Sequence, residues 1–239
     1  NPPGSYSDAR VMPAKTVCKL PDAIAFDTGA AMMLKGLTAQ YLLKKTLPVE
    51  GLQPGDHVLF HAAAGGVGLV FGQWANSIGA RVIGTVGSEE KAVIARAHGY
   101  HHVINYRTEN VVERVLEITG GEKLPVVYDG VGKDTFEMSL DCLRPRGLMV
   151  SFGNASGGVP PFDIMLLAQK GSLYATRPTL FTHTAKRDDL TAMAAEMFDL
   201  VRTGKIVSEP RQSFALKDAA GAHIALESRG TMGATVLLP

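Results

Sequence analysis

The fold is decided by Val58-Leu59-Phe60-His61-Ala62-Ala63-Ala64-Gly65-Gly66-Val67-Gly68, which leads from an apolar run through a glycine-rich turn into a helical pattern. In dinucleotide-binding folds, glycines at such a turn let the backbone approach a pyrophosphate, and the helix N-terminus attracts its charge. Ala63, Gly65 and Gly68 occupy the three fingerprint positions, with Ala in place of the first Gly. We therefore favour dinucleotide binding over a turn that serves only helix–strand packing.

Apolar runs and helix-period stretches alternate on both sides of this turn. The expected strands are His57–His61, Arg81–Val86, His102–Asn105, Val126–Asp129 and Leu148–Phe152, and the expected helices are Gly66–Ile78, Glu89–His98, Asn110–Thr119 and Lys133–Leu143. This alternation predicts an α/β fold with a doubly wound parallel sheet, the Rossmann architecture. Outside it we expect strands at Asp8–Met12, Thr16–Leu20 and Ala234–Leu238 and helices at Asp22–Leu43, Arg187–Thr203 and Lys217–Glu227.

The composition excludes several classes of protein. The 239-residue chain has a formal net charge of +1, from 24 basic and 23 acidic side chains, which gives no general attraction for nucleic acid or an anionic membrane. Cys18 and Cys142 are too few for a disulfide framework, so we expect a reducing compartment, the cytoplasm. No run of about 18 apolar residues predicts a membrane span. Because Asn1-Pro2-Pro3-Gly4-Ser5 has no initiator Met and no signal-peptide core, we expect an interior cut point there.

The end of the second expected strand favours NADP over NAD. NAD-binding proteins normally carry an acidic residue there for the ribose hydroxyls, but Ile83–Gly87 ends without one. Ser88 and Lys91 offer a hydroxyl and a cation for a 2′-phosphate, and Tyr106-Arg107 adds a hydroxyl or a stacking surface. Glu89-Glu90 would repel that phosphate unless the pair turns outward in the first turn of a helix capped by Ser88. The alternative for Lys91 is a solvated helix residue.

Short segments along nearly the whole chain match one protein family. They are Lys19-Leu20-Pro21-Asp22, Gly36-Leu37-Thr38-Ala39, His61–Gly68, Gly84-Thr85-Val86-Gly87, Val103-Ile104-Asn105-Tyr106-Arg107, Asp141–Gly147, Phe152–Gly157, Gln169–Leu173, Thr176-Arg177-Pro178 and Leu226-Glu227-Ser228-Arg229. With these motifs the chain resembles the quinone oxidoreductases, the zeta-crystallin-like branch of the medium-chain dehydrogenase/reductase superfamily.

The resemblance implies an NADPH site. It assigns Gly66, Val67, Gly87, Ser88, Lys91 and Tyr106 to the pyrophosphate and the 2′-phosphate, Phe152, Gly153 and Asn154 to the nicotinamide, and Arg229 to a late cofactor contact. Gly65 joins this set through the fingerprint. Thr38 and Arg177 are further cofactor candidates, although they could be a helix hydroxyl and a salt-bridge former. Family members usually have Ser where this chain has Gly130, which removes one possible hydroxyl contact to the cofactor.

The resemblance also implies the domain organisation. The family's chains open with a GroES-like catalytic domain, and residues 1–20 resemble only its tail. We therefore expect residues 1–37 to be that tail with a linking helix, 38–176 the Rossmann domain, and 177–239 a segment that returns to the catalytic domain. A chain without most of that domain would bind NADPH and turn over poorly.

The sequence predicts no catalytic metal and no nucleophile. Zinc-dependent members of the superfamily have a Cys where this chain has Leu34, and Leu cannot bind zinc. His101 and His102 are adjacent on an expected strand, so their side chains point to opposite faces and cannot share a metal. Cys142 follows Met138 by one helical turn, which is typical of a small core residue.

Hydride transfer from NADPH to a quinone is the reaction that the resemblance implies. The sequence does not indicate which residue would donate the proton. Reduction of the activated double bond of an enone or enal remains an alternative, because such an acceptor has similar electronics. A non-catalytic nucleotide- or RNA-binding module is the alternative from another class, and near-zero charge without a basic, aromatic-rich stripe disfavours RNA. The family is commonly dimeric, and Ser172–Ala175 could continue a sheet between subunits or serve as an internal sixth strand.

Overall fold

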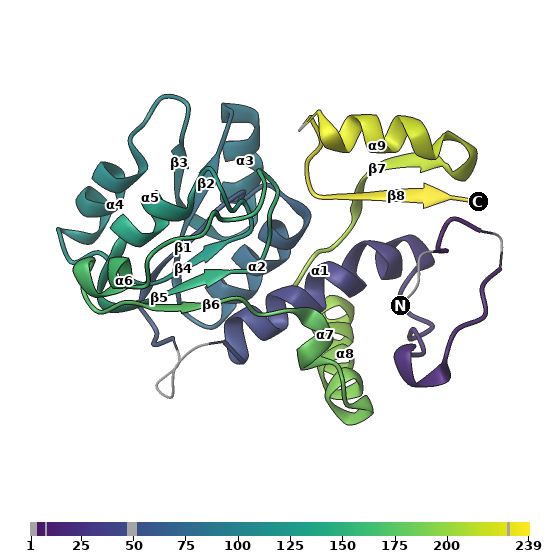
Figure 1. Cartoon of the computed structure of the whole chain (residues 1–239). Coiled ribbons are helices and arrows are strands. Elements are labelled where there is room, and N and C mark those ends of the chain that lie inside the picture. The colour runs from purple at the N-terminus through teal and green to yellow at the C-terminus, as the bar shows by residue number, and fades with distance from the viewer. Residues whose placement is uncertain (1–3, 8, 47–51, 229) are drawn as a thin grey trace.

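The computed structural model describes residues 4–7, 9–46, 52–228 and 230–239. Figure 1 shows a central sheet with helices on both faces, and beside it a long helix, α1 (Phe26–Lys44), that leads away to a second, smaller strand pair. Among the described residues, no helix has the length and apolar character needed to cross a membrane.

Six parallel strands form the central sheet in the order β3-β2-β1-β4-β5-β6. They are β1 (His57–Phe60), β2 (Arg81–Val86), β3 (Tyr100–Asn105), β4 (Leu124–Asp129), β5 (Leu143–Ser151) and β6 (Tyr174–Thr176). β1 is central, since Val58 pairs with Val82 on one side and with Val126 on the other. The strand order reverses between β1 and β4, which is the Rossmann topology that the alternating pattern predicts.

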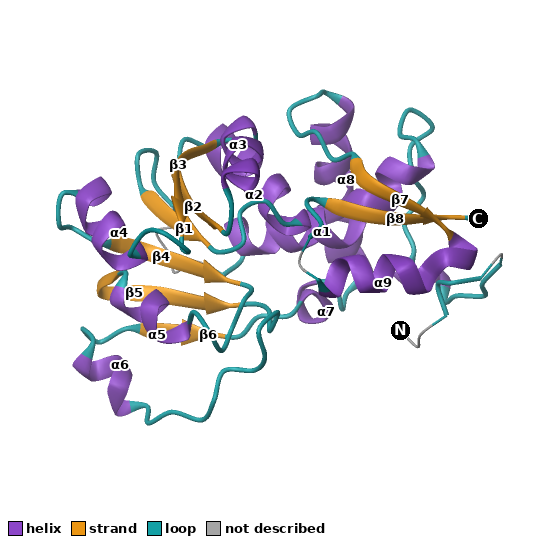
Figure 2. Ribbon diagram, turned by 90° about the horizontal axis from the view of Figure 1, so that it is seen from above, coloured by secondary structure: helices purple, strands orange, loops and turns teal. Residues whose placement is uncertain are grey.

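Helices cover both faces of this sheet (Figures 1 and 2). They are α2 (Gly66–Ser77), α3 (Glu89–Ala97), α4 (Val111–Thr119), α5 (Phe136–Asp141) and α6 (Met165–Gln169). One core packs Val58 and Phe60 against α1, α2 and α3, and the other packs Leu59 and Ile83 against α4 and α5. Because each central strand is buried on both faces, its sequence is a nearly continuous apolar run.

The C-terminal region adds a separate two-stranded parallel sheet, β7 (Pro210–Ala215) with β8 (Ala234–Leu238), connected through the 3-10 turn η2 (Leu216–Asp218) and α9 (Ala219–Glu227). Before it, α7 (Leu180–His183) and α8 (Arg187–Arg202) pack beside α1. Gly233 joins this region to the first turn of the central sheet: its N–H donates to Ala64 O over 2.8 Å, and it forms a parallel bridge with Gly65.

Several expected elements differ in the structure. Thr16–Leu20 is not a strand, and neither is the described part of Asp8–Met12, whose Asp8 lies outside the described residues. This segment instead holds the 3-10 turn η1 (Ala14–Thr16), because Pro13 interrupts it and no described strand pairs with it. α1 begins at Phe26, four residues later than expected, since a turn from Pro21 O to Ile24 N precedes it.

Other boundaries move for local reasons. The expected helix Lys133–Leu143 shortens to α5, because Gly132 to Thr135 form a turn, and β5 then begins at Leu143 instead of Leu148. β3 starts two residues early with a bulge, at which His101 Nδ1 accepts the N–H of Val82 over 3.1 Å.

Candidate cofactor site

The carboxyl ends of the central strands meet where the strand order reverses between β1 and β4. Four loops gather there, at residues 61–65, 87–88, 130–132 and 152–154. In open α/β sheets, ligands bind at this crevice. The sequence-predicted residues therefore come together from separate parts of the chain at one edge of the sheet.

The glycine turn is built by close backbone packing. A Cβ at Gly68 would lie 2.4 Å from Ala63 O and 2.7 Å from Ala62 O, so only Gly lets the helix approach the strand here. Ala62 holds a left-handed backbone with φ 60°, a conformation that costs a non-Gly residue about 1 kcal/mol. Of the three fingerprint positions, Ala63 thus lies in the turn after β1, Gly65 is the N-cap of α2 and Gly68 lies in its first turn.

The N-terminus of α2 is suited to an anion. Gly65 caps the helix through its backbone, without a side-chain hydrogen bond, and the first turn carries no acidic residue. The leading N–H groups, those of Gly66 and Val67 among them, have no acceptor within the helix. Together with the helix dipole they form a site of the type that binds phosphate.

The expected 2′-phosphate residues lie together after β2. Ser88 is the N-cap of α3, where its Oγ accepts the N–H of Lys91 over 3.4 Å. Glu89 pairs with Arg96 along the helix at 2.6 Å, which turns one acidic side chain outward as the capping prediction requires. A Cβ at Gly87 would lie 2.5 Å from Tyr106 Oη, so the tyrosine hydroxyl lies directly against the strand end.

The expected nicotinamide loop packs against the loop after β4. A Cβ at Gly153 would lie 2.5 Å from Gly130 O, and one at Gly130 would lie 2.9 Å from Phe152 Cζ. The Phe152 ring packs in turn on Phe60, with 5.5 Å between ring centroids. The ring therefore covers the position where family members have a Ser side chain, which explains how this chain accommodates Gly130.

Two further candidates lie in different surroundings. Thr38 is only 7% exposed in α1, and its hydroxyl donates to Leu34 O over 2.7 Å, as a helix hydroxyl does. Arg177 follows β6 and donates to Pro178 O over 3.3 Å. It lines a cleft of about 650 Å³ that also contacts Asn154. Arg229 is outside the described residues.

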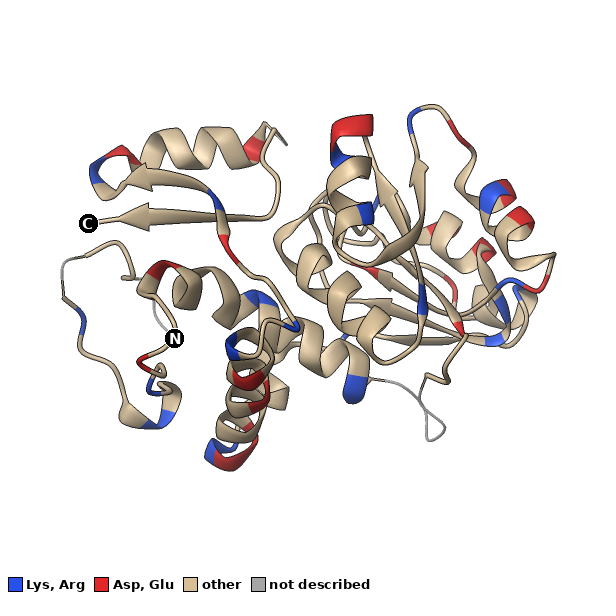
Figure 3. Cartoon of the chain, turned by 180° about the vertical axis from the view of Figure 1, so that it is seen from behind, with Lys and Arg blue, Asp and Glu red and all other residues tan. Residues whose placement is uncertain are grey.

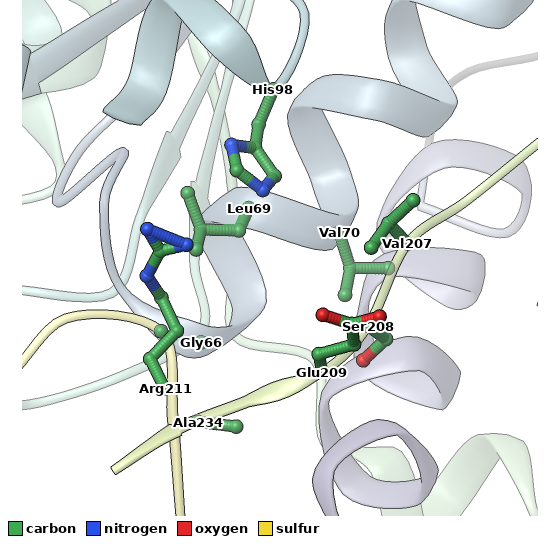
Figure 4. Close-up of a pocket in the computed structure, with 10 residues that line it drawn as sticks. Gly66, Leu69, Val70, His98, Val207, Ser208, Glu209, Arg211 and Ala234 are labelled. Atoms are coloured by element: carbon green, nitrogen blue, oxygen red, sulfur yellow. The ribbon is translucent and has the colours of Figure 1, made fainter. Parts of the chain in front are cut away.

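A second, smaller cavity of about 50 Å³ lies between α2 and the C-terminal strand pair (Figure 4). Gly66 and Leu69 line it from α2, and Arg211 and Ala234 line it from β7 and β8. The Arg211 side chain covers Gly233, where a Cβ would lie 2.7 Å from its Cδ. The C-terminal region thus packs directly on the helix that starts at the glycine turn.

Comparison with known proteins decides the family. The model of the zinc-binding dehydrogenases matches residues 66–198. A quinone oxidoreductase of Pseudomonas aeruginosa is 55% identical over 100% of this chain and 72% of its own length. A 2-haloacrylate reductase of a Burkholderia species is 47% identical over 100% and 72%. The crystal structure of Escherichia coli quinone oxidoreductase complexed with NADPH superposes with a TM-score of 0.95 at 51% identity, over 98% of this chain and 72% of that one.

The chain belongs to the quinone oxidoreductase family. It is thus an oxidoreductase of the medium-chain dehydrogenase/reductase superfamily, as its motifs indicate.

Although the matching family model is named for zinc, no group of three or more His, Cys, Asp or Glu residues in the described ranges could hold a metal ion. Leu34, at the position of the zinc enzymes' Cys, is 63% exposed on α1. Cys142 is buried, which raises the pKa of its thiol to about 12, so at neutral pH it is a protonated core group.

Next to the glycine turn, the chain contains a buried polar network that the sequence reasoning missed. Ser139 Oγ donates to Asp129 Oδ2 over 2.9 Å and therefore accepts from His61 Nε2 over 3.0 Å. His61 Nδ1 then accepts the hydroxyl of Thr85 over 3.0 Å, and Thr85 Oγ1 accepts the Ala62 N–H over 3.3 Å. Burial lowers the pKa of His61, with the charge of Asp129 acting in the opposite direction, which fits a neutral ring.

The network connects the loops around the site. Asp129 also accepts the N–H groups of Val131 and Gly132, at 2.7 and 3.0 Å, and the hydroxyl of Thr135 at 2.7 Å. Its carboxylate thereby fixes the loop after β4, while His61 and Thr85 fix the glycine turn. The sequence does contain a signal for this network, because polar residues stand at or just after the ends of β1, β2 and β4. It does not show which of these residues hydrogen-bond to one another, since the partners come from separate elements.

Proposed function

We propose that the chain binds NADPH and catalyses hydride transfer from it to a quinone, without zinc. The observation that carries this proposal is the glycine turn at the N-terminus of α2, together with a second strand that ends without an acidic residue and is followed by Ser88 and Lys91 at the start of α3. NADPH, when bound, supplies the hydride. The relative crystallised with NADPH and the named quinone oxidoreductases support the same reading.

The proposed cofactor residues fall into three groups and a set of three outer contacts. Gly65, Gly66 and Val67 hold the pyrophosphate, Gly87, Ser88, Lys91 and Tyr106 hold the 2′-phosphate, and Phe152, Gly153 and Asn154 lie beside the nicotinamide, with Thr38, Arg177 and Arg229 as outer contacts. The close packing at Gly68 fits the cofactor because it holds the start of α2 against the turn, and the close packing at Gly87 fits it because it brings the Tyr106 hydroxyl to the end of β2.

The proposed acceptor is a flat, conjugated carbonyl compound. The cleft beside Asn154 and Arg177 is lined mainly by apolar side chains, among them Phe136, Val159 and Phe162. Such a lining suits the ring of a quinone, and polar groups in the lining, Asn154 and Arg177 among them, suit its oxygens. A zinc ion has no role in this proposal, since Leu34 offers no ligand atom and the cofactor carries the chemistry.

Reduction of an activated double bond is the second candidate. The 47% identity with a 2-haloacrylate reductase favours it, because that relative's name denotes a conjugated substrate. A nucleic-acid-binding role has less support: Figure 3 shows Lys and Arg interspersed with Asp and Glu along α4 and α8, and the net charge is +1.

We also propose the organisation of the protein. Residues 38–176 form the NADPH-binding domain, and 1–37 and 177–239 belong with a GroES-like catalytic domain; the boundary after residue 37 lies inside the continuous helix α1. Two subunits pair through β6, the last strand of the sheet, where Tyr174 is 57% exposed. With its two cysteines unpaired, the protein would function in the cytoplasm.

The test compares NADPH and NADH binding in the wild type, Lys91→Ala and the control Lys205→Ala, which removes an exposed lysine elsewhere. Lys91→Ala should lose about 1–3 kcal/mol of NADPH binding and little NADH binding. Equal losses for both cofactors would refute the 2′-phosphate assignment. Steady-state rates with a benzoquinone, an enone and 2-chloroacrylate then rank the acceptors, and the highest kcat/KM for the quinone is the expected result.

A further inference from the structure

A lysine from outside the glycine motif crosses the start of α2. A Cβ built on Gly66 would lie 2.3 Å from Cε of Lys35 and 2.5 Å from its Cδ, so the lysine stem occupies the space that Gly66 leaves empty. Cε is the last carbon before the ammonium, which therefore lies one bond beyond this contact. Lys35 belongs to α1, three residues before Thr38, and reaches the turn because α1 packs along α2.

The environment of this ammonium is unfavourable without an anion. Lys35 is half-buried, and desolvation lowers its pKa. None of the ion pairs between described residues includes it. Its stem lies against the first residue of α2, whose N-terminus carries a partial positive charge and no acidic side chain in its first turn. A cation and the positive end of a helix dipole thus share one small region.

We propose that Lys35 is a cofactor-binding residue whose ammonium pairs with the pyrophosphate held at the N-terminus of α2. This inference rests on the proposed function and adds a cation to a site that otherwise consists of backbone N–H groups. It also accounts for Gly66: the glycine gives the lysine stem a path across the helix start, in addition to letting the backbone approach phosphate. Lys35 serves the part common to NADPH and NADH, whereas Lys91 serves the 2′-phosphate.

The test uses Lys35→Met, which keeps an unbranched side chain over Gly66 and removes the charge, and Lys35→Arg, which keeps the charge. Lys205→Met is the control, since Lys205 is an exposed lysine outside α1 and the glycine turn. Lys35→Met should weaken NADPH and NADH binding by similar factors of about 10 to 100, as expected for a lost charge-assisted contact. Its affinity for 2′-AMP, which has the 2′-phosphate but no pyrophosphate, should match the wild type. Lys35→Arg should recover most of the lost affinity.

A second readout separates binding from folding. Without ligand, Lys35→Met should unfold at the same temperature as the wild type or a higher one, because it removes a half-buried cation that has no anionic partner in the described structure. Wild-type NADPH affinity in Lys35→Met would overturn the inference and leave the proposed function intact. An Arg variant as weak as the Met variant, or an equal loss of 2′-AMP binding, would also overturn it. Failure of the wild type to bind NADPH would instead refute the proposed function.

Discussion

Replacing Gly68 by Ala should damage both the fold and the cofactor site. The new Cβ would lie 2.4 Å from Ala63 O, 2.7 Å from Ala62 O and 2.8 Å from Ala63 C. These are backbone atoms of the glycine turn, so the turn itself has to move. Overpacking of this kind costs about 1–3 kcal/mol, and more where the backbone is displaced, while Ala in place of Gly in a helix returns about 1 kcal/mol. We expect a net loss of about 2 kcal/mol, which lowers Tm by about 4–8 °C in a chain of this size.

Gly72→Ala is the matched control, one turn further along α2. Its Cβ would lie 2.4 Å from Tyr100 Cε2 and 2.5 Å from His98 O, so it should destabilise the fold to a similar extent, and none of its three nearest atoms belongs to the backbone of the turn. Thermal unfolding and NADPH titration of both variants give the comparison. Gly68→Ala should lose at least about tenfold in NADPH affinity, which corresponds to about 1.4 kcal/mol, whereas folded Gly72→Ala should bind like the wild type. A Gly68→Ala protein with wild-type Tm and affinity would refute the reasoning.

Three further predictions concern the buried groups. Ser139→Ala leaves the His61 Nε2–H without its acceptor and should lower the free energy of unfolding by about 1–3 kcal/mol in urea titrations; an unchanged midpoint would contradict the network. Burial lowers the pKa of His61 below 6.5 in the folded protein. As the pH falls, this histidine is therefore protonated in the unfolded chain before it is protonated in the folded one. The free energy of unfolding should therefore be constant above about pH 7 and fall as the pH drops below about 6.5. The fall should be less steep in His61→Gln. A pH profile of that variant that runs parallel to the wild type would exclude His61 as the cause of the fall. Native protein at pH 8 should react with a thiol reagent at Cys18 and not at Cys142, because burial raises the pKa of the Cys142 thiol to about 12. Unfolding in urea should make the Cys142 thiol reactive as well. Labelling of Cys142 in the native state would contradict its burial.

The central sheet was predictable because its signals are local. Each strand is an apolar run buried on both faces, and Gly or a capping side chain marks several boundaries, as at Ser88 and at Gly120, which adopts φ 62° after α4. Arg81–Val86 and Ala234–Leu238 have the predicted bounds. His101 shows the limit, because its side chain caps a bulge that starts β3 two residues early, and no periodicity marks a bulge.

Elements that depend on distant partners were missed. β7 reads Pro210-Arg211-Gln212-Ser213-Phe214-Ala215, with little apolar character, and forms a strand because β8 pairs with it from further along the chain. The short helices α6 and α7 have five and four residues, too few to show a helical period. Tertiary contacts decide such segments, and propensity decides them only weakly.

The candidate site divides in the same way. Short motifs mark the glycine turn and the Ser88 cap. Gly87 and Tyr106, which lie against each other, also belong to short motifs and are 19 positions apart in the sequence. The His61, Ser139 and Asp129 contacts join residues up to 78 positions apart, and Lys35 reaches Gly66 from another helix. Sequence patterns name the groups that bind a cofactor through a motif, but they do not show which side chains from other elements support it.

Binding of NADPH at the glycine turn is tested most directly by calorimetric titration of this chain with NADPH and NADH in parallel. We predict one site per chain, with NADPH bound more tightly than NADH because Ser88, Lys91 and Tyr106 are the residues that we propose contact its 2′-phosphate. Folded protein that binds neither nucleotide, or that prefers NADH, would contradict the proposal.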